Sequence, residues 1–229
     1  EKLFENKISM NLAPLVPHGT VRLAAMGPDN RNPNSKEISL MQDYVKEAMS
    51  AGAIGLSSGL EYAPGQYANE KELTTLGKVV SKFNGIYASH IRERGDNFES
   101  AVTEALNIAK LSEIPAQLSH LAPRPYAPQN SFNSVLTLID DARNNGEKIG
   151  IDTFPDIWGP AHLLDLLPRE LLDGTEKEIM LRLNDPKTAL KCEEYIQNQS
   201  NYLLRTGDFD SFFLSNSKSY PEFLEKSLK

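Results

Sequence analysis

Two of the chain's four histidines share a local setting that could bind a metal ion. His90 ends the apolar segment 86–90 with the pair Ser-His, and His120 ends segment 116–120 in the same way. Parallel strands bring their carboxyl ends to one edge of a sheet, where ligands bind. Neighbouring strands lie about 4.8 Å apart, so both imidazoles could reach one zinc ion with bonds of about 2.0–2.1 Å. The alternative is two unrelated polar residues that end strands.

A catalytic zinc ion usually takes three protein ligands, so we considered further candidates in the chain. Asp152 follows the next expected strand. His18 fits a structural loop as well as it fits a site. Cys192 lies in a polar helical segment and fits a half-buried helix residue better than a ligand, and we interpret His162 as a surface residue.

The elements that would position these residues alternate between short apolar strands and amphipathic helices. We expect a strand region at 12–23, interrupted at His18, and strands beginning near 53, 86, 116 and 149. The expected helices are 37–50, 69–84, 97–111 and 131–145, the first with a capping box of Asn34 and Glu37. Strand–helix alternation predicts an α/β fold with a parallel sheet, open and doubly wound or closed as a (β/α)8 barrel. No Gly-rich phosphate-binding motif follows any strand, which weakens the nucleotide-binding version.

The pattern changes after Pro155, which defines the predicted domain organisation. Residues 1–155 contain the regular βα units. Residues 156–205 are predicted to be a helical excursion near the barrel mouth, with short helices at 161–166, 175–183 and 186–198. Residues 206–229 would return toward the barrel, with a short strand at 212–214.

Composition and charge exclude several classes of protein. The chain has 229 residues and a net charge of −7, which argues against a nucleic-acid or anionic-membrane partner. No apolar run approaches the roughly 20 residues of a membrane span. The single cysteine excludes a disulfide framework and favours a reducing, cytoplasmic setting. Because the chain begins with Glu1 and not Met, we expect it to be a piece of a longer protein.

Six short segments together resemble one known family. They are Asn11–Arg22, Ala51–Leu60, Glu61–Ala68, Tyr87–Arg92, Gln117–Leu121 and Asp152–Pro155. In this order and spacing they resemble the N-acyl-D-amino-acid deacylases of the amidohydrolase superfamily. The resemblance covers most of residues 9–195, and the combination is far more specific than any one segment.

This resemblance implies a fold and a metal. The fold would be part of a metal-dependent (β/α)8 barrel, about strands 3 to 7, with a helical insertion after the last clear strand. His90 and His120 would bind Zn²⁺. The family's His-x-His pair and ligand cysteine would precede Glu1, and its catalytic aspartate would follow Lys229, so no catalytic residue is expected inside the chain.

The resemblance also implies substrate contacts, with two departures from the family pattern. Phe154 stands where the family has a tyrosine that contacts the substrate. Tyr62 lies in the loop after a strand and is a candidate, by that position, to contact the substrate or the tetrahedral oxyanion, although it fits loop packing equally well. The family usually has lysine where this chain has Ala122. Its Tyr-Pro-Tyr element is Phe154, Pro155 and Asp156 here, which puts the usual substrate preference in doubt.

The predicted function is metal-dependent hydrolysis of the linear amide bond of N-acyl-D-amino acids, with a zinc-bound water as nucleophile. We expect the 229-residue chain alone to be inactive, and its partner to be a small-molecule substrate with neither nucleic acid nor membrane involved. Two alternatives stay open. One is a non-catalytic truncated or degenerate barrel, and the other is an amidohydrolase that acts on a cyclic amide.

Overall fold

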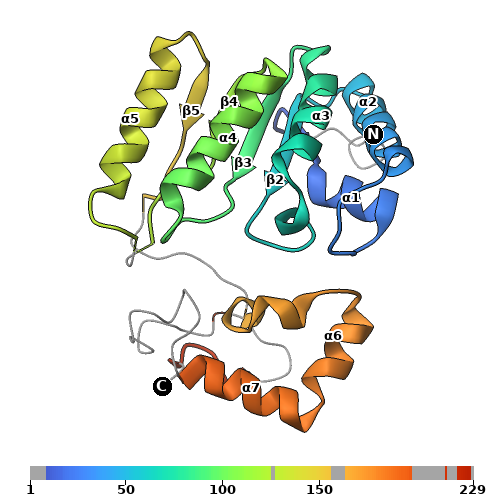
Figure 1. Ribbon diagram of the computed structural model, residues 1–229, viewed down its shortest axis with the longest axis vertical. Coiled ribbons are helices and arrows are strands. Elements are labelled where there is room, and N and C mark those ends of the chain that lie inside the picture. The colour runs from blue at the N-terminus through green and yellow to red at the C-terminus, as the bar shows by residue number, and fades with distance from the viewer. Residues whose placement is uncertain (1–8, 125–126, 156–162, 198–214, 216–220, 228–229) are drawn as a thin grey trace. The chain divides into compact units, whose positions relative to one another are not determined.

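The computed structural model describes residues 9–124, 127–155, 163–197, 215 and 221–227. The chain divides into two compact units, Glu1–Ile157 and Trp158–Lys229. The division therefore lies within two residues of the predicted boundary at 155. Each unit is described by itself below (Figure 1).

The first unit is built on a five-stranded parallel sheet (Figure 1). Its strands are β1 (Leu15–Pro17), β2 (Gly55–Gly59), β3 (Ile86–His90), β4 (Ala116–Leu118) and β5 (Ile149–Ile151). Each strand pairs in parallel with the next one along the chain. A doubly wound sheet would reverse this order at a switch point, whereas a (β/α)8 barrel keeps it. The predicted α/β fold, a partial barrel, is confirmed.

Helices connect the strands and pack against one another in chain order. They are α1 (His18–Met26), α2 (Ser35–Ser50), α3 (Glu70–Ser81), α4 (Phe98–Ser112) and α5 (Ser131–Asn144), with a 3₁₀ turn η2 at Gly65–Tyr67. Helices α3, α4 and α5 lie across the same face of the sheet (Figure 1). The predicted capping box is present, because Asn34 accepts from the Glu37 backbone N–H and Glu37 accepts from the Asn34 backbone N–H.

The prediction of a strand region reaching residue 23 is wrong. The strand ends at Pro17, and His18–Met26 is helix α1. The helix buries His18, Val21, Arg22 and Met26. These four residues have helical spacing, but two of them, His18 and Arg22, are polar, so the buried face does not show as an apolar stripe in the sequence.

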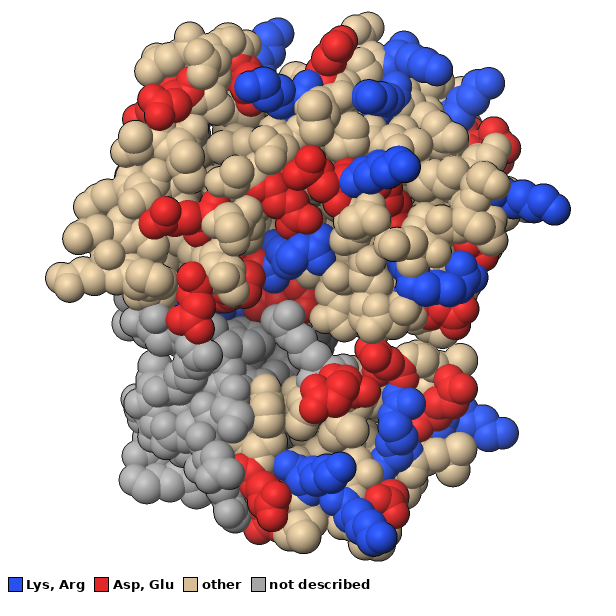
Figure 2. Space-filling view, in the orientation of Figure 1, with Lys and Arg blue, Asp and Glu red and all other residues tan. Residues whose placement is uncertain are grey.

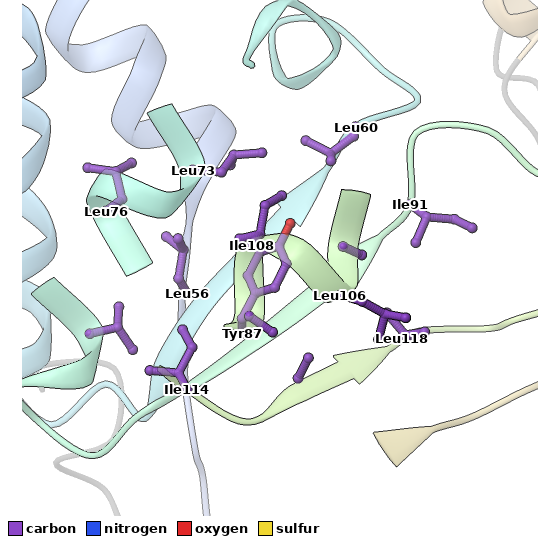
Figure 3. Packing of buried hydrophobic residues seen from close by; sticks show 14 of the residues in the cluster. Leu56, Leu60, Leu73, Leu76, Tyr87, Ile91, Leu106, Ile108, Ile114 and Leu118 are labelled. Atoms are coloured by element: carbon purple, nitrogen blue, oxygen red, sulfur yellow. The ribbon is translucent and has the colours of Figure 1, made fainter. Parts of the chain in front are cut away.

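The core lies between the sheet and its helices (Figure 3). Leu56, Tyr87 and Leu118, one from each of three neighbouring strands, are fully buried. Burying an apolar side chain of this size contributes about 1.5–3 kcal/mol. Inside the core, the Tyr87 hydroxyl forms hydrogen bonds with the hydroxyls of Ser58 at 2.7 Å and Ser89 at 3.3 Å. Burial of Tyr87 therefore leaves no polar atom of its side chain unpaired.

Gly55 allows β2 and β3 to approach closely. A Cβ atom at this position would lie 2.2 Å from the backbone oxygen of Ile86. Any larger residue would therefore push the two strands apart at the start of their pairing.

The second unit is helical in its described part. It contains the 3₁₀ turns η3 (Leu163–Leu166), η4 (Arg169–Leu172) and η6 (Pro221–Phe223), and the helices α6 (Glu176–Leu183) and α7 (Pro186–Gln197). The described residues between 163 and 197 contain no strand. That residues 156–205 form an excursion near the barrel mouth remains a prediction. Residues 212–214, where a strand was predicted, lie outside the described residues.

Charged side chains of both signs share the surface. Figure 2 shows Lys and Arg side chains interspersed with Asp and Glu over the visible face of the described residues. Among the helices that the structure describes, none combines the length and the apolar character needed to cross a membrane.

Candidate metal centre

His90 and His120 lie side by side at the carboxyl ends of β3 and β4. Their ring centroids are 4.4 Å apart and the ring planes meet at 75°. The prediction that matched Ser-His segments on neighbouring parallel strands would bring two imidazoles together is confirmed. That the pair binds a metal ion remains a prediction.

Backbone pairing beyond the formal strand ends positions the two rings. Gly59 of β2 is in register with His90 of β3, and Leu60 N–H then donates to His90 O at 3.0 Å. On the other side, Ser119 N–H donates to Ser89 O at 2.9 Å. His120 itself lies two residues beyond β4, in a turn, so the predicted strand 116–120 ends early.

A buried carboxylate that the sequence did not single out holds His90. Glu61 Oε2 lies 2.6 Å from His90 Nε2, and the Glu61 side chain is only 3% exposed. Arg124 Nη2 lies 3.2 Å from Glu61 Oε1, and Arg94 Nη2 lies 3.8 Å from Oε2. Burial alone would raise the pKa of Glu61, but the His90 hydrogen bond and the two guanidinium charges outweigh it and lower the pKa to about 2. Glu61 is therefore an anion at neutral pH.

The atoms around the two rings fit a metal ion. Glu61 occupies Nε2 of His90, and metal-ligating histidines commonly donate one ring N–H to a carboxylate while the other nitrogen binds the ion. Nδ1 of His120 is buried and makes no hydrogen bond with any described residue. Burial lowers the pKa of His120, and the neighbouring His90 and Arg94 lower it further, which favours the neutral form that a metal ligand needs.

Two aromatic rings flank the histidines. The Tyr62 ring lies 4.9 Å from that of His90, and the Phe154 ring stacks on His120 at 5.6 Å with an interplanar angle of 1°. Both aromatic residues are partly exposed, at 38% and 43%. All four residues predicted from sequence as site residues thus form one row, and the substrate contact predicted for the outer two remains a prediction.

His18 belongs to a different cluster and does not join this pair. Its Nε2 lies 2.8 Å from Glu72 Oε1, and Arg22 Nη1 donates to Glu72 Oε2 at 2.5 Å. All three side chains are buried. Burial raises the pKa of Glu72, but His18 and Arg22 lower it by more. His18 begins helix α1 and does not lie in the loop that the sequence suggested.

The other candidate ligands also have different settings. Asp152 accepts a hydrogen bond on each carboxylate oxygen, from His120 N–H and from Gln117. Cys192 is buried on α7 of the second unit, where burial raises the pKa of its thiol. His162 lies outside the described residues. Within the described parts of the chain, no group of three His, Cys, Asp or Glu side chains is placed to hold one ion.

A cavity of about 330 Å³ lies elsewhere on the sheet. Its lining includes the middle residues Gln117 of β4 and Gly150 of β5, and the strand-starting residues Ile86, Ala116 and Ile149. The last three residues begin β3, β4 and β5, at the opposite ends from the histidines. Neither His90 nor His120 lines the cavity.

Three curated relatives match part of the chain. An N-acyl-D-glutamate deacylase of Alcaligenes xylosoxydans xylosoxydans is 38% identical over 148 residues, which are 64% of this chain and 30% of the relative. A D-aminoacylase of the same organism is 31% identical, over 68% of this chain and 32% of the relative. An N-acyl-D-aspartate deacylase from it is 33% identical, over 52% and 24%.

Solved structures show the same relationship. The N-acyl-D-glutamate deacylase of Bordetella bronchiseptica, solved with zinc and a phosphonate mimic of the tetrahedral intermediate, superposes with a TM-score of 0.63 at 36% identity. The match covers 68% of this chain and 33% of that one. The chain is related to the N-acyl-D-amino-acid deacylases. The family predicted from the motifs is therefore confirmed.

The chain matches only part of each related protein. A D-aminoacylase described as defining a subset of amidohydrolases matches with a TM-score of 0.61 at 30% identity, over 66% of this chain and 32% of that one. No family model matches the chain. The chain spans about a quarter to a third of the length of the curated deacylases it matches.

Proposed function

We propose that His90 and His120 supply two ligands of a zinc site in an enzyme that hydrolyses the amide bond of N-acyl-D-amino acids. The observation that carries this proposal is the pair of rings 4.4 Å apart, with Glu61 on Nε2 of His90 and a buried Nδ1 of His120 that makes no hydrogen bond with any described residue. The relationship to deacylases supports the reaction. The related deacylase structure that contains zinc supports zinc as the metal ion of this site.

A zinc ion, when bound, would supply Lewis-acid activation of water and of the amide carbonyl. The chain's own residues prepare the site for it. Glu61 accepts the N–H of His90 Nε2 and so leaves Nδ1 as the ligating nitrogen. Arg94 and Arg124 keep Glu61 ionised, which keeps that hydrogen bond strong.

Tyr62 and Phe154 line the site on either side of the histidines. Their partial exposure leaves ring surface available to a ligand, and aromatic walls with few polar groups are typical of small-molecule sites. We assign them to contact the substrate and exclude water from the reacting amide. Phe154 stands where the family usually has tyrosine, so this contact would be apolar.

The general base is assigned, as the family resemblance implies, to an aspartate beyond Lys229. Near the histidines, Glu61 and Asp152 are engaged in hydrogen bonds to the protein itself. The described residues offer two histidine ligands and no positioned base, so the 229-residue chain should bind zinc weakly and show no turnover. The missing base alone is typically worth about 10²–10⁴-fold in rate.

The test is an assay of the protein expressed from the complete open reading frame, beside the 229-residue chain. Substrates are N-acetyl-D-glutamate, N-acetyl-D-aspartate, a neutral N-acetyl-D-amino acid and a cyclic amide. Zinc-dependent release of a D-amino acid by the complete protein, abolished in His90→Ala, supports the proposal. Failure to hydrolyse any linear amide when loaded with zinc would contradict it.

The cyclic amide is included because of Ala122. This residue stands where the family usually has lysine, so a contact to a linear, carboxylate-bearing substrate is replaced by a methyl group. Hydrolysis of the cyclic substrate alone would favour the alternative hypothesis of an amidohydrolase that acts on cyclic amides.

A further inference from the structure

We propose that Gln117 and Asp152 form a clamp that positions His120 for metal binding, and that Gly150 is small because the Gln117 side chain lies over it. The proposal rests on the zinc site proposed above. It makes Asp152 a positioning residue and not a third zinc ligand.

Asp152 holds the turn that carries His120 by both its backbone and its side chain. Its N–H donates to Leu118 O at 3.2 Å, and its own carbonyl accepts from Leu121 N–H at 2.7 Å. Between these two, its Oδ1 accepts from His120 N–H at 2.6 Å. Asp152 is therefore bonded to the chain before, at and after His120.

The segment needs this support because His120 has a left-handed backbone. Its φ is 40°, a conformation that non-glycine residues rarely adopt. Such a conformation persists only where the surroundings over-determine it. The carboxylate on the His120 N–H supplies that constraint and so fixes the direction in which the imidazole leaves the chain, toward His90.

Gln117 fixes the Asp152 carboxylate in turn. Its Nε2 donates to Asp152 Oδ2 at 2.6 Å, so the oxygen that does not hold His120 is also engaged. Gln117 and Gly150 are direct partners in the pairing of β4 with β5. A Cβ atom at Gly150 would lie 2.1 Å from Gln117 Oε1. The absence of a side chain at Gly150 therefore makes room for Gln117 to reach Asp152.

Zinc affinity of the purified 229-residue chain, measured by competition with a chromophoric chelator, is the first test. Residues that orient metal ligands typically contribute about 10–100-fold to affinity, so Asp152→Ala should weaken zinc binding by about that factor. Asp152→Asn keeps an oxygen acceptor for the His120 N–H but places an NH2 group opposite Gln117 Nε2, so it should lose less zinc affinity than Asp152→Ala. The exposed Asp140→Ala on α5 is the matched control and should bind zinc as the unaltered chain does. Equal losses in Asp152→Asn and Asp152→Ala would indicate a pure charge effect and overturn the clamp.

Gly150→Ala and Gln117→Ala test the second half of the clamp. Each alone should weaken zinc binding, because each removes the Gln117 side chain from Asp152. In the Gln117→Ala background, Gly150→Ala should cause no further loss, since the next atom near its Cβ is Ala116 O at 3.8 Å. Additive losses would contradict the proposed role of Gly150.

Amide hydrogen exchange at His120, measured by NMR without metal, separates this proposal from the proposed function. Asp152→Ala should speed exchange at the His120 N–H by about tenfold or more, with little change at Leu121, which binds the backbone of residue 152. If zinc does not bind but this exchange increases, the metal site fails and the clamp stands. If zinc binds through the histidines but exchange and affinity are unchanged in Asp152→Ala, the clamp fails and the metal site stands.

Discussion

The rings of His90 and His120 meet edge to face, 4.4 Å apart between centroids. Each is held from outside the pair, His90 by Glu61 on Nε2 and His120 by Asp152 on its backbone N–H. Ligands whose positions are set by neighbouring groups lose less conformational freedom when an ion binds. The arrangement therefore fits the two-histidine part of the zinc site that we propose.

Glu61→Gln should weaken zinc binding by about 10–100-fold, because the amide is a poorer partner for His90 than the carboxylate. It should also lower the free energy of unfolding by about 3 kcal/mol, since Arg94 and Arg124 lose their buried counter-charge. Glu72→Gln is the matched control in the other buried ion cluster. It should lower stability similarly and leave zinc affinity unchanged, as measured by urea unfolding and chelator competition. A change in zinc affinity on Glu72→Gln would mean that global destabilisation explains both results.

Acid should destabilise the first unit between about pH 4.5 and pH 2. The folded pKa of Glu61 is about 2, below its ordinary value of 4.5, so Glu61 stabilises the folded state above pH 4.5 and loses that contribution as pH falls through its folded pKa. Lowering a pKa by one corresponds to about 1.4 kcal/mol of stability, so the effect amounts to a few kcal/mol. Urea unfolding at pH 6, 4.5 and 3 measures it. Glu61→Gln should show a shallower pH dependence over this range, and an unchanged slope would show that other groups are responsible.

Gly55→Ala should strongly destabilise the sheet, because its Cβ would lie 2.2 Å from the Ile86 backbone oxygen and the strands would have to separate. Gly59→Ala on the same strand is the control, since its nearest neighbour is Tyr62 Cδ2 at 3.9 Å. We expect a loss of more than about 2 kcal/mol for Gly55→Ala and within about 0.5 kcal/mol for Gly59→Ala in urea unfolding. Similar losses for both variants would contradict the observed pairing of β2 with β3.

Tyr62→Ala and Phe154→Ala should leave zinc affinity nearly unchanged and raise the KM of the complete enzyme for N-acyl-D-amino acids. Both rings are partly exposed and lie against the histidine rings, Tyr62 at 4.9 Å from His90 and Phe154 at 5.6 Å from His120. Steady-state kinetics with metal-saturated enzyme provide the measurement. A fall in zinc affinity as large as that expected for Glu61→Gln would contradict this prediction. It would show that the two rings hold the histidines in place and do not act by contacting the substrate.

Much of the sheet could be predicted because its strands are short apolar runs separated by one amphipathic helix each. The same regularity brought His90 and His120 together, since matched strand ends on neighbouring strands must meet. Helix α1 was missed because two of its buried residues, His18 and Arg22, are polar and are paired with Glu72, 50 or more positions away. Such pairing leaves no local signal.

Glu61 was missed as a site residue for a related reason. It lies just beyond β2, so a carboxylate near the end of the strand beside His90 was visible in the sequence. Its partners, however, are distant in the chain, at His90, Arg94 and Arg124. Whether such a carboxylate faces solvent or holds a histidine depends on tertiary contacts that hydrophobic periodicity does not encode.

The most direct test of the central claim is the zinc affinity of His90→Ala and His120→Ala beside His18→Ala, measured on the same chain by chelator competition. The account predicts that either of the first two substitutions abolishes specific zinc binding, because one remaining histidine cannot hold the ion. His18→Ala should lower the free energy of unfolding by about 1–3 kcal/mol, since Glu72 loses a buried hydrogen-bond donor, and should leave zinc affinity unchanged. Zinc binding that survives the loss of His90 and His120 would contradict the account.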